Sequence, residues 1–126
     1  MTAPLTKIVV LQLIALALTS CASQNDSAHV VEDYFQAIVH YDFERLAELT
    51  CAEKEADAIK TATSFRGTDA AIQDMQCSVA ETNEGYNIVQ CQGKIVVSYQ
   101  AELREFPLGR YRIIQQGDTW RVCGEA

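Results

Sequence analysis

The hydrophobic positions of this chain change their spacing twice, and each change predicts a different kind of segment. Residues 8–18 are apolar throughout except for Gln12. Apolar residues then recur every three or four positions up to residue 65, which is typical of helices. After Gly67 they recur at every second position, which is typical of strands.

Three helices are expected in the helical half. The first covers residues 28–41 with Asp26 or Ser27 as its cap, and the second follows a cap at Asp42. Residues 50–53 have the form of a capping box and open the third. The side chains expected to face the core are Val31, Tyr34, Phe35, Ile38 and Tyr41, then Phe43, Leu46 and Leu49, then Ala56, Ile59 and Ala62 or Thr63.

Four antiparallel strands are expected in the other half. A three-residue loop at residues 83–85 joins the first two, a strand over residues 103–115 bends at residues 107–109, and a turn leads into a last strand at residues 119–123. The inward-facing positions are Met75, Cys77, Val79, Val89, Cys91, Ile95, Val97 and Tyr99. The fold class is therefore α+β, with three N-terminal helices packed on a curved four-stranded antiparallel sheet.

The apolar N-terminal run predicts an export signal. It is too short to span a bilayer, Lys7 precedes it, and the small residues Thr19 and Ser20 follow it. Residues 18–21 resemble a lipobox, in which the thiol of Cys21 carries diacylglycerol. The alternative is an ordinary secretory signal that leaves Cys21 as a core or disulfide cysteine.

This interpretation divides the chain into three parts. Residues 1–20 are the signal peptide, residues 21–27 are the lipidated cysteine with a short polar tether, and residues 28–126 form one domain. We expect a lipid anchor in the cell envelope, and the Ala22 that follows the cysteine favours the outer membrane if the cell has two membranes.

The other four cysteines are Cys51, Cys77, Cys91 and Cys123. An even number in an oxidising compartment predicts two disulfides, and the absence of a Cys-x-x-Cys pair argues against zinc, so no metal or cofactor is expected. Four cysteines allow three pairings. The hairpin loop places Thr82 opposite Tyr86 and therefore favours Cys77 with Cys91, which leaves Cys51 with Cys123.

Charge limits the partners. The whole chain has a net charge of -7, and the mature part is more acidic still because Lys7 is the only charged residue of the signal. We therefore expect no nucleic-acid partner. Arg110 and Arg112 share one strand face, which is either a homodimer surface or a face that charge keeps soluble, and we favour the second.

Two sets of residues are candidates for chemistry. His29, Asp33, Gln36 and His40 form one stripe of the first helix, which we interpret as a solvated face. Tyr34, Tyr41, Tyr99 and Tyr111 are expected to point toward an interior pocket. No carboxylate or histidine is placed beside these tyrosines as a general base, so we do not expect an enzyme. Trp120 is expected to anchor the core.

Three segments carry a resemblance to the nuclear transport factor 2-like superfamily, and to its short bacterial lipoproteins of unassigned function. They are residues 34–38, residues 42–49 and the closing segment 117–122. The resemblance implies a cone-like sheet covered by helices. It implies no single function, because the superfamily contains isomerases, cyclases, dehydratases, transport adaptors and immunity proteins.

The expected function is that of a membrane-anchored binding or interaction module, with a small ligand or an envelope protein as its partner. The alternatives are a structural spacer of the envelope and an isomerase-like or cyclase-like enzyme that uses the cone pocket.

Overall fold

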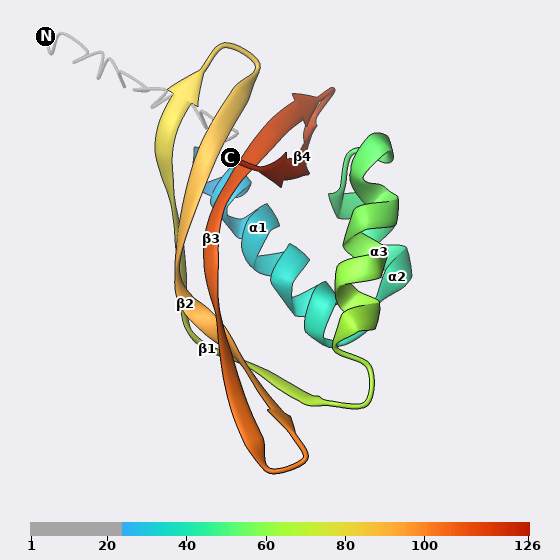
Figure 1. The fold of residues 1–126 in the computed structure, drawn as a ribbon. Coiled ribbons are helices and arrows are strands. Elements are labelled where there is room, and N and C mark those ends of the chain that lie inside the picture. Colours follow the sequence, from blue (N-terminus) through green and yellow to red (C-terminus); the bar gives the residue numbers. More distant parts are fainter. Residues whose placement is uncertain (1–23) are drawn as a thin grey trace, which may run out of the picture.

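Three α-helices and a 3-10 turn precede a four-stranded sheet in a computed structural model that describes residues 24–126 (Figure 1). The elements are α1 (Gln24–Val39), α2 (Phe43–Leu49), η1 (Ala52–Lys54), α3 (Glu55–Ser64), β1 (Asp69–Asn83), β2 (Tyr86–Tyr99), β3 (Glu102–Gln116) and β4 (Thr119–Glu125). The strands pair antiparallel in the order β1-β2-β3-β4, so the α+β class is confirmed. The predicted signal peptide and Cys21 lie outside the described residues.

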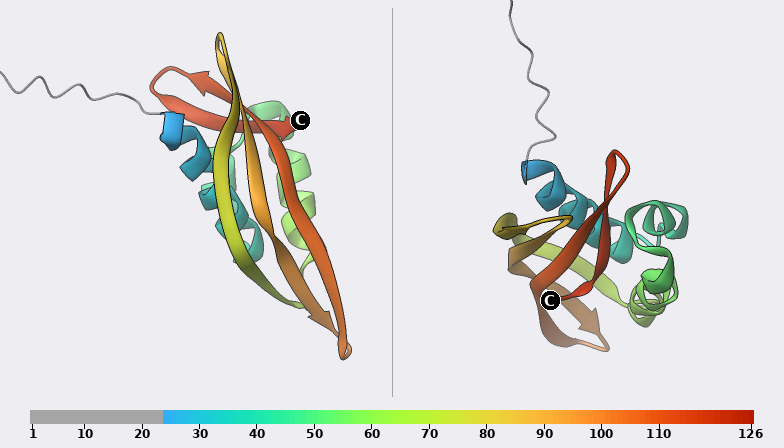
Figure 2. Two further views of the ribbon diagram at one scale, coloured as in Figure 1. Left: turned by 90° about the vertical axis from the view of Figure 1, so that its left-hand side faces the viewer. Right: turned by 90° about the horizontal axis from the view of Figure 1, so that it is seen from above.

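All the helices lie on one side of a curved sheet (Figures 1 and 2). Helix α1 runs along the concave face and contacts β1, β2 and β4, while α2 and α3 pack beside it. Between these layers lies a core whose most deeply buried side chains include Val31, Ile38, Leu46, Val89, Ile113 and Val122. Trp120 packs against this core and is half-buried.

Helix α1 begins earlier than its polar N-terminal residues suggested. Its first residue is Gln24 rather than Ala28, and Ser27 is fully buried, with its hydroxyl accepting a 3.1 Å hydrogen bond from Asn87 Nδ2. The predicted tether therefore does not extend to residue 27. Local polarity suggested an exposed linker, but a long-range polar contact buries part of it.

Helix α2 begins as predicted. The side chain of Asp42 accepts a 3.1 Å hydrogen bond from the backbone N–H of Arg45, which satisfies one of the free donors of the first turn. Leu46 and Leu49 are buried and Phe43 is half-buried.

The predicted capping box before the third helix is wrong. The hydroxyl of Thr50, which would be the cap, has no hydrogen-bond partner among the described residues, and the backbone N–H of Cys51 donates to the carbonyl of Val122 at 2.9 Å. This contact holds the chain against β4, so the α-helix starts only at Glu55. Ala62 is buried and Ile59 is half-buried as predicted, but one turn earlier Ala58 is buried and Ala56 is exposed.

The hairpin between β1 and β2 pairs Cys77 with Cys91 as predicted, but its loop and its register differ from the prediction. The loop has two residues, Glu84 and Gly85, rather than three, because Asn83 pairs with Tyr86. A bulge at Ala80 then shifts the register by one. The two differences cancel, and Cys77 lies opposite Cys91.

A second irregularity bends the middle of the sheet. The register shifts by one residue on β1 at Asp74 and on β2 beside Gly93. A Cβ atom at Gly93, whose φ is +99°, would lie 2.6 Å from the carbonyl oxygen of Gln73, so only glycine fits there. The predicted bend at residues 107–109 lies opposite this bulge, but the extra residue belongs to β2.

Candidate functional site

A pocket of about 580 Å³ opens between the helices and the inner face of the sheet. Its aromatic lining residues are Tyr34, Phe35, Phe65, Phe106 and Tyr111. Its polar lining residues are Thr50, Lys54, Asp57, Thr61, Tyr34, Tyr111 and Glu125. This volume lies within the range of small-molecule sites, and the mixture of rings and a few polar groups is typical of them.

The deepest rings form a contiguous cluster at the junction of α1 and β3. The ring centroids of Phe35 and Tyr111 are 5.2 Å apart, and those of Tyr34 and Tyr111 are 5.9 Å apart. Phe65 and Phe106 form a separate edge-to-face pair at 5.9 Å, where the end of the helical layer meets β3. Two groups of aromatic side chains therefore line the cavity.

The two pocket tyrosines are held in their neutral form. Burial, followed by the nearby charges of Glu125 and Asp57, raises the pKa of Tyr34 from 10.0 to about 12. Burial also raises the pKa of Tyr111, with further contributions from Tyr34 and Glu125. At neutral pH both hydroxyls are therefore available to donate or accept hydrogen bonds.

Three charged side chains stand at the pocket mouth. Lys54 Nζ lies 3.8 Å from Asp57 Oδ2, and both side chains are largely exposed, at 46% and 74%. Glu125, at the end of β4, forms no ion pair with another described residue. The mouth consequently carries one uncompensated negative charge.

Thr50 contributes an unusual polar atom to the pocket wall. The residue is 2% exposed, and its hydroxyl oxygen has no hydrogen-bond partner among the described residues. A buried hydroxyl without a partner costs about 1–3 kcal/mol.

Two of the four tyrosines predicted to point into a pocket do not line it. Tyr41 lies beyond the end of α1 and donates its phenol hydrogen to the carbonyl of Phe65. Tyr99 is 54% exposed, because β2 continues past the helices to a two-residue turn at Gln100 and Ala101. Its predicted inward orientation is wrong for this reason.

The three charged residues of the pocket mouth were not among the predicted site residues. Lys54, Asp57 and Glu125 have no local pattern that marks them, and Glu125 lies beyond the predicted end of the last strand. Their meeting depends on the contact between Cys51 and β4, which hydrophobic spacing does not report. The orphaned Thr50 hydroxyl was assigned to the capping box.

The cysteines form the two pairs that the sequence favoured. Cys77 and Cys91 join neighbouring strands with a Cα–Cα distance of 4.0 Å, and Cys51 and Cys123 join the helical layer to β4 at 5.1 Å. Disulfides of this kind persist where thiols are oxidised, which indicates a location outside the reducing cytoplasm.

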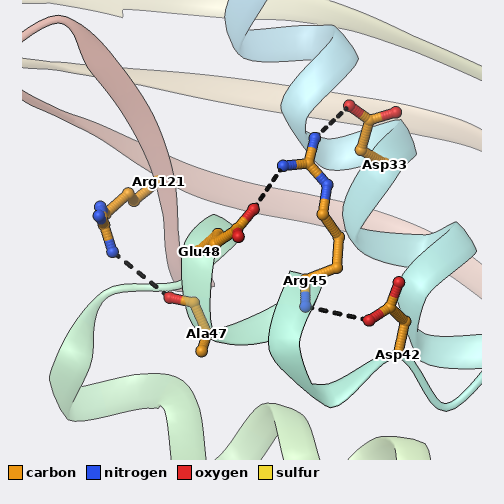
Figure 3. A network of polar contacts seen from close by, with 6 residues as sticks. All are labelled: Asp33, Asp42, Arg45, Ala47, Glu48 and Arg121. Carbon is orange, nitrogen blue, oxygen red and sulfur yellow. Dashed lines mark hydrogen bonds and ion pairs between the residues drawn. The ribbon is translucent and has the colours of Figure 1, made fainter.

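The polar stripe of α1 does not line the pocket, and its Asp33 belongs to an exposed network (Figure 3). Arg45 bridges Asp33 at 3.3 Å and Glu48 at 2.9 Å, and all three side chains are largely exposed. His40 Nδ1 lies 2.7 Å from the carbonyl of Gln36. These contacts support the interpretation of the stripe as a solvated face.

Arg121 links β4 to the end of α2 in the same region (Figure 3). Its Nη1 donates to the carbonyls of Ala47 and Thr50 at 3.4 and 3.5 Å. A cation at a helix C-terminus is favourable because the last carbonyls carry partial negative charge. Arg121 therefore helps to hold the segment that carries Thr50 in the pocket wall.

Within residues 24–126, no cluster of three or more His, Cys, Asp or Glu side chains is arranged to bind a metal ion. No helix in the same range has the length and apolar character needed to cross a bilayer. No known family model matches the sequence, and no curated protein matches it.

Proposed function

We propose that the chain is a lipid-anchored lipoprotein of the cell envelope whose folded domain binds a small organic molecule. The pocket is the observation that carries the proposal. It combines a volume of about 580 Å³ with five aromatic rings and a small number of convergent polar groups. The superfamily resemblance is compatible with this proposal, because its members use the same interior for different ligands.

Two observations support a location in the cell envelope. The two disulfides favour an oxidising compartment. The apolar run before Cys21 has the length of an export signal, and the residues before the cysteine resemble a lipobox. Anchoring through Cys21 would keep the domain at a membrane surface.

Lipid attachment is tested with the full chain produced in a lipoprotein-processing bacterium. We expect incorporation of labelled palmitate and an intact mass that begins at Cys21. The Cys21→Ser variant should lose the label, and Ser23→Ala should keep it. A wild-type chain that retains Met1 or carries no acyl group would contradict the anchor.

Ligand binding is tested by native mass spectrometry of the protein extracted gently from its own membranes. Thr61 and Thr63 give a matched pair, because both are exposed on α3 and each hydroxyl donates to the carbonyl four residues earlier. Only Thr61 lines the pocket. We expect a bound small molecule in the wild type and in Thr63→Trp, and its loss in Thr61→Trp. Equal spectra for all three proteins would contradict the proposal.

An isomerase-like or cyclase-like enzyme is the second candidate, and Glu125 favours it. A carboxylate near two neutral phenols could remove a proton while a phenol donates to a carbonyl oxygen. The test is exchange of the α-protons of small ketones in D₂O, followed by NMR, with Glu125→Gln as the control. Exchange that Glu125→Gln does not slow would reject this role.

A structural spacer is the remaining alternative. It predicts that deletion weakens the envelope under osmotic stress and that the pocket-blocking variant Thr61→Trp restores resistance as well as the wild type does. Failure of Thr61→Trp to restore resistance would favour the ligand-binding proposal instead.

A further inference from the structure

We infer that the pocket selects an organic cation, namely an ammonium group carried on an aromatic or aliphatic body. This inference rests on the proposed ligand-binding function and specifies the chemical class of the ligand. It follows from how the rings and the charges are arranged around the same cavity.

The first step is the sign of the charge at the mouth. Lys54 and Asp57 compensate each other at 3.8 Å, whereas Glu125 has no cationic partner among the described residues. A ligand that enters therefore meets a net negative site on a chain whose overall net charge is -7. Attraction of cations and repulsion of anions follow from Coulomb's law.

The second step is the nature of the walls. Tyr34, Phe35 and Tyr111 form one ring cluster, and Phe65 with Phe106 forms another, so a ligand would contact aromatic surface on two sides. The faces of such rings carry partial negative charge, and a cation over a ring gains about 0.5–2 kcal/mol. Both tyrosine rings are neutral at physiological pH, since a phenol ionises only at about pH 10 or above.

The third step separates an organic cation from a metal ion. A metal ion needs several oxygen, nitrogen or sulfur ligands, and no cluster of that kind occurs within the described part of the chain. The pocket instead offers apolar rings and one uncompensated carboxylate. These groups suit a weakly hydrated ammonium with an apolar body.

The experiment compares three probes that share a benzyl or phenyl body and differ in charge. Benzyltrimethylammonium, benzyl alcohol and benzoate are titrated into the detergent-solubilised full chain by isothermal titration calorimetry. We expect the cation to bind about tenfold more tightly than the neutral probe, and benzoate to bind most weakly.

Two substitutions at the mouth should have opposite effects. Glu125→Gln should weaken binding of the cation about fivefold, while Glu102→Gln, an exposed control at the far end of β3, should not. Lys54→Gln frees Asp57 and should strengthen binding of the cation about threefold, with Lys60→Gln as its control. Circular dichroism of each variant verifies that it is folded.

The outcomes separate this inference from the function on which it rests. Binding of benzoate or benzyl alcohol as tight as that of the cation, abolished by Thr61→Trp, would overturn the inference and leave ligand binding intact. No binding of any probe would also overturn it. A wild type that additionally retains no molecule in native mass spectrometry would overturn the proposed function as well.

Discussion

The inner face of the sheet is covered by helices, whereas the outer face carries charged side chains in open solvent. Inward-facing Val89 and Ile113 are fully buried. On the other side Arg110 pairs with Glu81 at 3.2 Å, and both remain about half exposed. The inner face therefore forms both the core and the pocket, while the charged outer face mainly keeps the protein soluble. Substitutions on the inner face should lower the free energy of unfolding more than substitutions on the outer face.

The largest effect is expected where the helical layer is tied to the sheet. Replacing Cys51 and Cys123 by alanine removes a link across 72 residues and should lower the free energy of unfolding by about 4 kcal/mol. Replacing Cys77 and Cys91 opens a loop of only 14 residues and should cost about 3 kcal/mol. Urea denaturation without reductant measures both. A larger loss from the hairpin pair would reverse the ranking.

The second-largest effect is expected at alkaline pH, where ionisation of Tyr34 on the inner face should lower the free energy of unfolding. Because folding raises the pKa of Tyr34 from 10.0 to about 12, its stabilisation is complete below pH 10 and is lost as the pH rises toward 12. The full effect is about 2–3 kcal/mol. Denaturation at pH 8 and pH 11 should show a smaller loss for Tyr34→Phe than for the wild type. The exposed control Tyr99→Phe should behave like the wild type, and identical curves for all three would contradict the assignment.

The buried contact between Asn87 and Ser27 should have a moderate effect. Asn87 is 1% exposed, so Asn87→Ala removes a buried hydrogen bond to the Ser27 hydroxyl. We expect a loss of about 1 kcal/mol from the removed hydrogen bond and faster amide exchange in the first turn of α1. Exposed Asn83→Ala, at the tip of the same hairpin, is the control. Unchanged exchange in α1 would show that the contact does not set the start of the helix.

The smallest effect is expected on the outer face. Arg110→Ala should change the free energy of unfolding by less than about 0.5 kcal/mol, because its partner Glu81 is exposed to water. Arg110→Glu also tests the homodimer that the sequence analysis considered. We expect the same sedimentation coefficient for both proteins. Dissociation of a wild-type dimer by Arg110→Glu would establish the dimer surface instead.

The sequence predicted well which side chains of the helices and strands face the core, because burial within one element follows the local spacing of apolar residues. Val31, Phe35 and Ile38 are buried in α1 as the three-and-four pattern indicated. The alternation of Val89 and Cys91 likewise identified the inner side of β2. Each of these assignments needs only the geometry of one element.

The pocket was predicted less well, because its polar groups come from segments far apart in the chain. Tyr34 and Tyr111 were identified by their position on apolar faces, but Asp57 and Glu125 have the local pattern of solvated residues. They meet only because residues 50–51 lie against β4. A carboxylate at a pocket mouth and one on an ordinary surface have the same sequence signature.

For the exported lipoprotein proposed above, the position of Cys123 in the last strand has a consequence. A polypeptide that crosses a membrane with its N-terminus first presents Cys51, Cys77 and Cys91 to the oxidising side before Cys123 emerges. Until then Cys77–Cys91 is the one of the two bonds within residues 24–126 that can close, and Cys51 can mispair with Cys77 or Cys91, which follow it in the chain. Completion of this protein therefore depends on release of its final residues, and a thiol isomerase would act on the interval before that moment.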